Sequence, residues 1–223
     1  YHFYHSMNPK NSIFTMKIEF GIGTKEDPSL QYAAELGNMI GSEKYSFNEF
    51  KEELQKIGGT INFFSSGDYF GLDVKGFDKN FQKTMDMTGE FLRTMKVRKE
   101  DEKKLKKLIQ GSNLERMLEG RNASTKGNAL RDYALWGQNS NYLKRSTIKE
   151  VKKMDTEFLL GKIMSAMNYE TTVFYVGTLK FEEVKNSIKE NLILDNQLEK
   201  SSSPVVYEQQ LNNKNTIYFL SLI

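Results

Sequence analysis

Residues 13–42 constrain the fold most, because a strand pattern is followed there by a helix pattern. Apolar and polar side chains alternate from Phe14 to Phe20, which is typical of a strand with one buried face. Asp27-Pro28 predicts a helix start, since Asp accepts hydrogen bonds from free helix amides and Pro at the first position has no amide to lose. The helix is expected to run to about Ile40 with a face of small residues, which suits close packing on a sheet.

Strand and helix patterns alternate through the rest of the chain. Ser46 and Glu49 have the spacing of a capping box, and Gly58-Gly59 is expected to end the helix that they begin. A β-hairpin is predicted next, with strands over Thr60–Ser65 and Tyr69–Lys75. The further expected elements are helices over 81–95, 99–119, 127–136, 147–154, 155–167 and 180–192, and a strand over 169–176. This order predicts an α+β fold.

The two ends of the chain differ in composition from its centre. Residues 1–12 are expected to form an N-terminal linker, because His2 and His5 lack a third metal ligand and the stretch has no convincing helix pattern. Residues 196–215 are rich in Ser and Asn, as linkers are. Residues 216–223 are apolar and resemble the first strand of a following domain or a closing segment. The chain begins without Met, so we expect it to be a piece of a longer protein.

Charge and composition exclude several classes of function. The 32 Lys and Arg residues and 29 Asp and Glu residues are interspersed, and the net charge of +3 gives no basic field for nucleic acid. The chain has no Cys, which removes disulfides, thiolate metal sites and Cys nucleophiles. There is no apolar run near the roughly 20 residues that span a bilayer.

Three stretches resemble the insulinase/pitrilysin family of zinc metallopeptidases. Residues 30–42, LQYAAELGNMIGS, are similar to the family pattern L-Q-H-F-L-E-H-M-L-F-x-G-T around its H-x-x-E-H motif. Gly58-Gly59 followed by Asn62–Ser65 is similar to G-G-x-x-N-A-x-T, and residues 173–191 resemble the end of a family domain. The resemblance implies a peptidase-like domain over 13–195. It also implies a two-layer sandwich, with a mainly antiparallel sheet and helices on one face.

The residues that would bind zinc in this family are absent. Tyr32 and Leu36 stand where the two His ligands are expected, and Glu35 keeps the position of the general base between them. The third ligand, a Glu about 76 residues beyond the second His, falls on Ser112, with Glu115 one turn away. An alkyl side chain cannot ligate zinc. We therefore predict no catalytic residue, no metal site and no cofactor in this chain, with zinc held by an active partner half.

The resemblance implies a role in binding rather than in cleavage. Family proteins are built from tandem halves that close around an unfolded peptide, and this chain resembles part of a half without zinc. The family's exposed edge strand, which accepts peptide as an added strand, corresponds here to Asn62, Phe63, Phe64 and Ser65. The expected partners are a zinc-bearing half and a peptide substrate, with no nucleic acid and no membrane span.

Two other functions stay open. The chain is alternatively a purely structural or protein-interaction subunit that has no role in proteolysis, or a self-sufficient peptidase that takes up zinc. The presence or absence of a zinc-bearing half in the same precursor or operon decides between the non-catalytic half and the structural subunit. The self-sufficient peptidase predicts that the isolated chain takes up zinc. The absence of Cys and the resemblance to bacterial tandem peptidases favour the bacterial cell envelope or periplasm.

Overall fold

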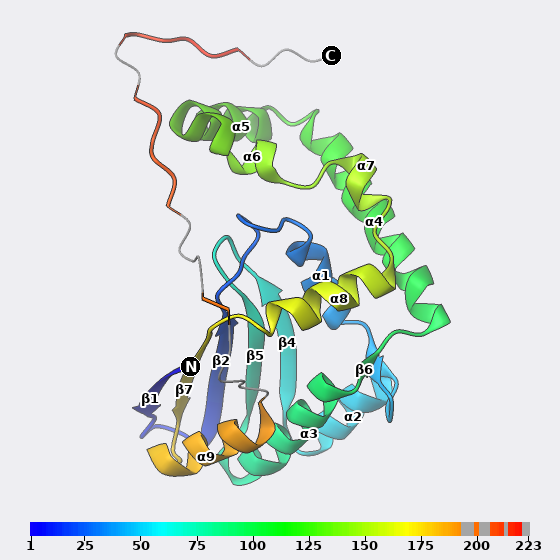
Figure 1. The fold of residues 1–223 in the computed structure, drawn as a ribbon, viewed down its shortest axis with the longest axis vertical. Coiled ribbons are helices and arrows are strands. Elements are labelled where there is room, and N and C mark those ends of the chain that lie inside the picture. Colours follow the sequence, from blue (N-terminus) through cyan, green and yellow to red (C-terminus); the bar gives the residue numbers. More distant parts are fainter. Residues whose placement is uncertain (193–198, 201–205, 212–213, 220–223) are drawn as a thin grey trace.

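The computed structural model describes residues 1–192, 199–200, 206–211 and 214–219, and the central element is a five-stranded sheet (Figure 1). The strands lie in the order β1 (His2–Met7), β7 (Thr171–Gly177), β2 (Ile13–Phe20), β5 (Phe70–Phe77) and β4 (Thr60–Ser65). The β1–β7 pair is parallel and the other three pairs are antiparallel. Gly41–Ser42 (β3) and Met95–Lys96 (β6) form a separate short pair.

Helices cover one face of the sheet, which gives the predicted two-layer α+β sandwich. In Figure 1, α1 (Leu30–Gly37), α8 (Thr156–Ala166), α3 (Phe81–Arg93) and α9 (Phe181–Asn191) lie in front of the strands, with α2 (Phe47–Lys56) beside α3. The alternating residues of β2 account for this arrangement, because Phe14, Met16 and Ile18 are completely buried. The sheet side chains on this face and the apolar faces of the helices form one core.

The sequence predicted most element boundaries closely. The hairpin of β4 and β5, the helix α4 (Lys99–Glu119) and the capping box of α2 are confirmed. The start of α1 is different. Its first residue is Leu30 and its N-cap is Ser29, because the Asp27 carboxylate accepts hydrogen bonds from the amide and hydroxyl of Ser29 instead of capping a helix at Pro28.

The prediction that residues 1–12 form a linker is wrong for most of the stretch. All six residues of β1 pair with β7, and the His5 ring stacks on Tyr175 with ring centroids 5.3 Å apart. His2 contacts the Glu170 carboxylate at 3.0 Å, and His5 contacts the carbonyl oxygen of Leu179 at 2.8 Å. The stretch lacked a helix pattern because it is a short edge strand, in which half-buried Phe3 and His5 alternate with exposed neighbours.

Beyond the sheet, α4 leads to an upper group of short helices (Figure 1). These are α5 (Ala123–Trp136), α6 (Asn141–Lys144) and α7 (Ile148–Val151). A short 3₁₀ turn, Gly137–Asn139, lies between α5 and α6, and another, Asp78–Asn80, precedes α3. No helix within the described residues has the length and apolar character that crossing a membrane requires.

The predicted linker and following strand fall largely where the structure gives no description. Residues 193–198, 201–205, 212–213 and 220–223 lie outside the described residues. The described residues between them, including 216–219, belong to no helix or named strand. The assignments of 196–215 to a linker and of 216–223 to a new domain therefore stay predictions.

Candidate functional site

The residues at the predicted ligand positions lie on α1, between the sheet and α4. Leu36 is completely buried and Tyr32 is 3% exposed, so both side chains belong to the core cluster. Glu35 points away from them and is exposed, without a hydrogen bond or ion pair in the described part of the chain.

Tyr32 meets Ser112 across the α1–α4 contact. The two hydroxyl oxygens are 3.1 Å apart, so the expected third-ligand position does face the first. One turn further along α4, Arg116 donates from Nη2 to the Tyr32 hydroxyl at 3.1 Å and from Nη1 to the Ser146 carbonyl at 2.5 Å. Glu115 is exposed on α4. The cluster of Tyr32, Ser112 and Arg116 thus connects α1, α4 and the segment before α7.

This cluster does not fit a zinc ion. Its donors are two hydroxyl groups without an imidazole or carboxylate, and Leu36 offers only carbon atoms. The Arg116 guanidinium places a fixed positive charge beside Tyr32, where it repels a divalent cation. No group of three His, Cys, Asp or Glu residues in the described ranges is arranged to hold a metal ion.

The β4 strand forms an edge of the sheet, since β5 is its only neighbour among the described strands. Of the four residues at the predicted peptide-binding positions, Phe63 is 2% exposed and packs in the core near the Phe70 ring. Phe64 is half-buried on the opposite face, with the Lys17 ammonium 4.7 Å from its ring centroid. Asn62 is exposed and Ser65 is half-buried. Peptide contacts through side chains are therefore restricted to one face.

The Asn38 side chain occupies part of this edge. Its Oδ1 accepts from the Phe63 amide and its Nδ2 donates to the Phe63 carbonyl, both at 2.8 Å. Opposite residues of an antiparallel pair alternate between exchanging two hydrogen bonds and exchanging none. Phe63, opposite Leu72, therefore directs its backbone groups to the free edge, and by alternation Ile61 and Ser65 do the same.

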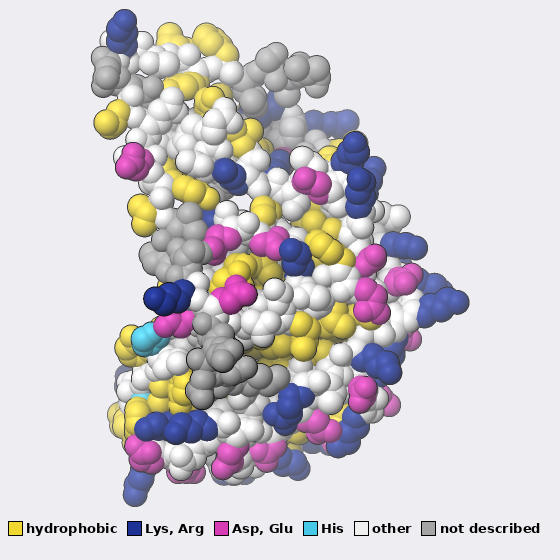
Figure 2. Space-filling model, in the orientation of Figure 1, with side chains coloured by type: hydrophobic (Ala, Val, Ile, Leu, Met, Phe, Trp, Pro, Cys, Tyr) yellow, Lys and Arg dark blue, Asp and Glu magenta, His cyan; other side chains and the backbone are white. Residues whose placement is uncertain are grey.

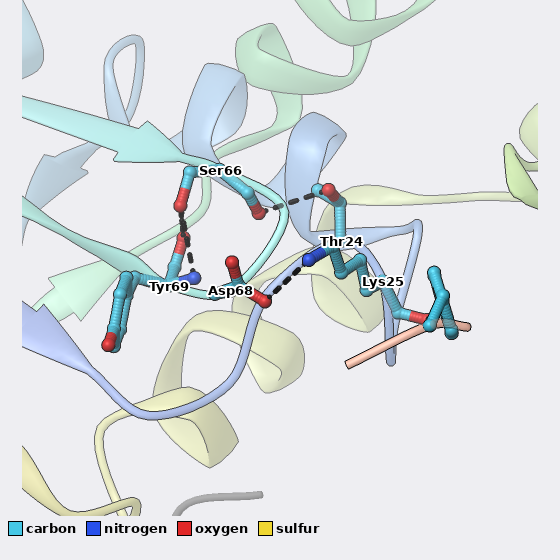
Figure 3. Close-up of polar contacts among 6 residues, drawn as sticks. Thr24, Lys25, Ser66, Asp68 and Tyr69 are labelled. Atoms are coloured by element: carbon cyan, nitrogen blue, oxygen red, sulfur yellow. Dashed lines mark hydrogen bonds and ion pairs between the residues drawn. The ribbon is translucent and has the colours of Figure 1, made fainter. Parts of the chain in front are cut away.

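The loop before α1 fixes the helix relative to the β4–β5 turn (Figure 3). The hydroxyl of Thr24 donates to the Ser66 carbonyl at 3.0 Å, and Lys25 forms an ion pair with Asp68 at 2.9 Å. On the other side of the loop, Lys162 of α8 pairs with Asp27 at 2.7 Å. Burial by itself would raise the pKa of the Asp27 carboxyl, but hydrogen bonds from Lys162 and Ser29 outweigh it and lower that pKa.

A polar cavity of about 490 Å³ lies above this loop, facing α6. Lys25, Lys144 and Arg145 contribute its positive groups. Two of these three charges are compensated, because Lys25 pairs with Asp68 and Arg145 pairs with Glu119 at 2.7 Å. The cavity shows no arrangement for catalysis.

Comparisons with known proteins relate the sequence and the fold of this chain to peptidases. The sequence model of the insulinase family, peptidase family M16, matches residues 22–126, which include α1, the β4–β5 hairpin and α4. Residues 22–126 are thus similar in sequence to the insulinase family. No curated protein sequence matches the chain significantly.

Several solved structures of proteases and of a peptidase-like domain share the fold of this chain at low sequence identity. The ferredoxin protease FusC, in complex with Arabidopsis ferredoxin, has a TM-score of 0.72 at 12% identity, over 89% of this chain and 22% of that one. The first half of the periplasmic protease PqqL from Escherichia coli has a TM-score of 0.69 at 18% identity, over 95% and 47%. A peptidase M16 inactive domain from Pseudomonas fluorescens has a TM-score of 0.67 at 11% identity, over 83% and 45%. This chain thus spans less than half of the length of each of these chains.

Sequence analysis missed the two residues that complete the site. Arg116 follows Ser112 by one helical turn and so shares its face of α4, a spacing that makes it a candidate neighbour of Tyr32. Asn38 stands where the family pattern quoted above has Leu, and this exchange of an apolar for an amide side chain was the available signal. The contact of Asn38 with Phe63 joins positions 25 residues apart, which no local pattern reveals.

Proposed function

We propose that this chain is the non-catalytic part of an insulinase-type metallopeptidase, which pairs with a zinc-bearing half and completes a chamber for unfolded peptide. The observation that carries the proposal is that Tyr32, Leu36 and Ser112 stand at the expected ligand positions, where Tyr32 hydrogen-bonds to Ser112 and to Arg116. The scaffold around these positions resembles that of the family, whereas the side chains that would ligate zinc are absent and Glu35 has no metal-bound water to activate. This combination supports a role in binding.

A surface for the partner half is available on α4. Leu114, Met117 and Leu118 are 56%, 59% and 53% exposed, and they lie on the side of the helix opposite Ser112 and Arg116. Exposed apolar side chains that form a continuous helix face mark protein interaction sites. In contrast, Figure 2 shows Lys, Arg, Asp and Glu side chains interspersed over the helix-covered side of the molecule.

The edge of β4 supports peptide contact. A strand with an unpaired edge adds a peptide through main-chain hydrogen bonds, so binding depends little on the peptide's sequence. The outward backbone groups of Ile61 and Ser65 are placed for such bonds. The bacterial envelope stays the predicted compartment, and the partner and peptide class stay proposals.

Reconstitution tests this function. The full chain is mixed with the zinc-bearing half of the same precursor or operon, and complex formation and cleavage of an unfolded peptide are measured. We expect a stable complex whose peptidase rate exceeds that of the zinc-bearing half alone by about tenfold or more, because the chamber positions the substrate. A complex with an unchanged rate supports the alternative of a purely structural subunit. Absence of a complex contradicts both functions.

A further inference from the structure

The contact between Asn38 and Phe63 resembles the pairing of two strands. A side-chain amide carries one carbonyl acceptor and one N–H donor group, as a peptide group does. The Asn38 amide uses both toward a single residue, with its Oδ1 2.8 Å from the Phe63 amide nitrogen and its Nδ2 2.8 Å from the Phe63 carbonyl oxygen. An added strand would require these same two backbone groups of Phe63.

We propose that the Asn38 side chain is a built-in substitute for an added strand, so that the β4 edge accepts a peptide only when this side chain withdraws. The inference rests on the proposed role of β4 in peptide contact and concerns the control of that site. Unprotected strand edges invite pairing with other chains, and proteins cover them in various ways. Here Asn38 covers both backbone groups of Phe63 at the middle of the edge, and the Asn62 side chain also donates to the Phe63 carbonyl, at 3.1 Å.

The backbone around Asn38 is fixed, so only the side chain is free to move aside. The Asn38 amide nitrogen donates to the Ala34 carbonyl at 3.2 Å, which holds the residue at the end of α1. A Cβ atom on Gly37 would lie 2.7 Å from the Phe63 ring, so helix and strand are already in close contact. Rotation about the side-chain bonds of Asn38 then opens the edge without moving α1.

The position of Asn38 determines which hydrogen bonds a peptide bound along β4 cannot form. A peptide that runs along β4 can pair with Ile61 and Ser65, whose outward groups flank Phe63. While Asn38 stays in place, the two hydrogen bonds at Phe63 are unavailable to that peptide. Two hydrogen bonds of ordinary net strength correspond to about a tenfold change in affinity.

The experiment compares peptide binding by the full chain and its Asn38→Ala variant. The probe is a short fluorescein-labelled peptide with the repeat Thr-Val-Thr-Lys, followed by fluorescence anisotropy. A second peptide with Pro at alternate positions has fewer main-chain donors and reports whether binding needs the backbone. Asn80→Ala is the matched control, since the Asn80 amide also binds a backbone carbonyl, that of Ile57 at 2.7 Å, away from the β4 edge.

We expect Asn38→Ala to bind the first peptide about tenfold more tightly than the wild type, and Asn80→Ala to bind it like the wild type. Amide hydrogen exchange at Phe63 is expected to become faster in Asn38→Ala and slow again when peptide is added. Equal binding by the wild type and Asn38→Ala, or no binding by either, overturns the inference. Reconstitution with the zinc-bearing half is a separate experiment, and its result tests the proposed function independently of the role of Asn38.

Discussion

At the scale of single residues, the positions that the resemblance matches to zinc ligands are packing and hydrogen-bonding positions. Leu36 contributes to the core, whereas Tyr32 and Ser112 share a hydrogen bond that Arg116 extends to the Ser146 carbonyl. These interactions stabilise the α1–α4 contact without a metal. Ion pairs of Lys25 with Asp68 and of Asp27 with Lys162 also hold the loop before α1 in place.

Asp27 makes the stability of the chain depend on pH. Its pKa is lowered from the ordinary value of 3.8, because hydrogen bonds from Lys162 and Ser29 outweigh the effect of burial. A lowered carboxyl pKa contributes stability above the unfolded pKa, and this contribution is lost as the pH falls through the folded pKa. We expect Asp27→Asn to lower the free energy of unfolding at pH 7 by about 1 kcal/mol.

Urea denaturation at neutral and acid pH checks this expectation. The difference between wild type and Asp27→Asn should shrink as the pH falls below the ordinary carboxyl pKa of 3.8 and through the lowered pKa of the folded state. Lys162→Gln removes the other member of the ion pair, so the two substitutions should not be additive. A difference that is independent of pH would contradict the assigned role of the carboxylate.

Gly37 is a second residue with a testable constraint. Its missing side chain allows the Phe63 ring to approach, and a Cβ there would lie 2.7 Å from two ring atoms. We expect Gly37→Ala to lower the free energy of unfolding by about 1–3 kcal/mol, because the core must shift to admit the methyl group. Gly111→Ala on α4 is the control, since a Cβ at Gly111 meets no atom within 4 Å in the described structure. Thermal denaturation of both variants provides the comparison.

At the scale of elements, β1 and α4 each have a structural role that the sequence did not predict. The first strand extends the sheet through six paired residues and packs His5 on Tyr175. The helix α4 has two faces with different roles, since Ser112 and Arg116 face α1 while Leu114 and Leu118 face solvent. Both elements therefore yield predictions that differ from those for a linker or a solvated helix.

Deletion of residues 1–7 tests the role of β1. Removal of a linker would leave stability unchanged, whereas removal of a paired strand exposes the β7 edge and part of Tyr175. We expect a loss of about 1–3 kcal/mol in the free energy of unfolding. Urea denaturation measures it, and an unchanged midpoint would show that β1 contributes nothing to the sheet's stability.

Charged substitutions test the outer face of α4. Leu114→Glu combined with Leu118→Glu should weaken pairing with the zinc-bearing half by about a hundredfold, because two charges would be buried in an apolar contact. The fold should be retained, since both side chains are more than half exposed. Analytical ultracentrifugation of the mixture measures pairing, and circular dichroism controls for folding. Unchanged pairing would exclude this face from the interface.

At the scale of the whole molecule, a peptidase scaffold is retained around a site that cannot hold zinc. Isothermal titration with zinc should show no stoichiometric uptake by the full chain. Restoring imidazoles with Tyr32→His and Leu36→His should still not give tight binding, because Ser112 provides no carboxylate and Arg116 remains beside the site. One equivalent of zinc bound by the wild type, and lost on substitution of Tyr32, would restore the self-sufficient peptidase as the function.

The sequence by itself determined the α+β class, the β4–β5 hairpin and most helices, because these depend on periodicity and on caps such as Ser46 and Glu49, which act within a few residues. It also determined the absence of His at the ligand positions. Only the tertiary structure decided that residues 2–7 join the sheet, that Arg116 binds Tyr32 and that Asn38 covers the β4 edge. Each of these contacts joins residues far apart in the chain, where geometry is set by packing and leaves no local pattern.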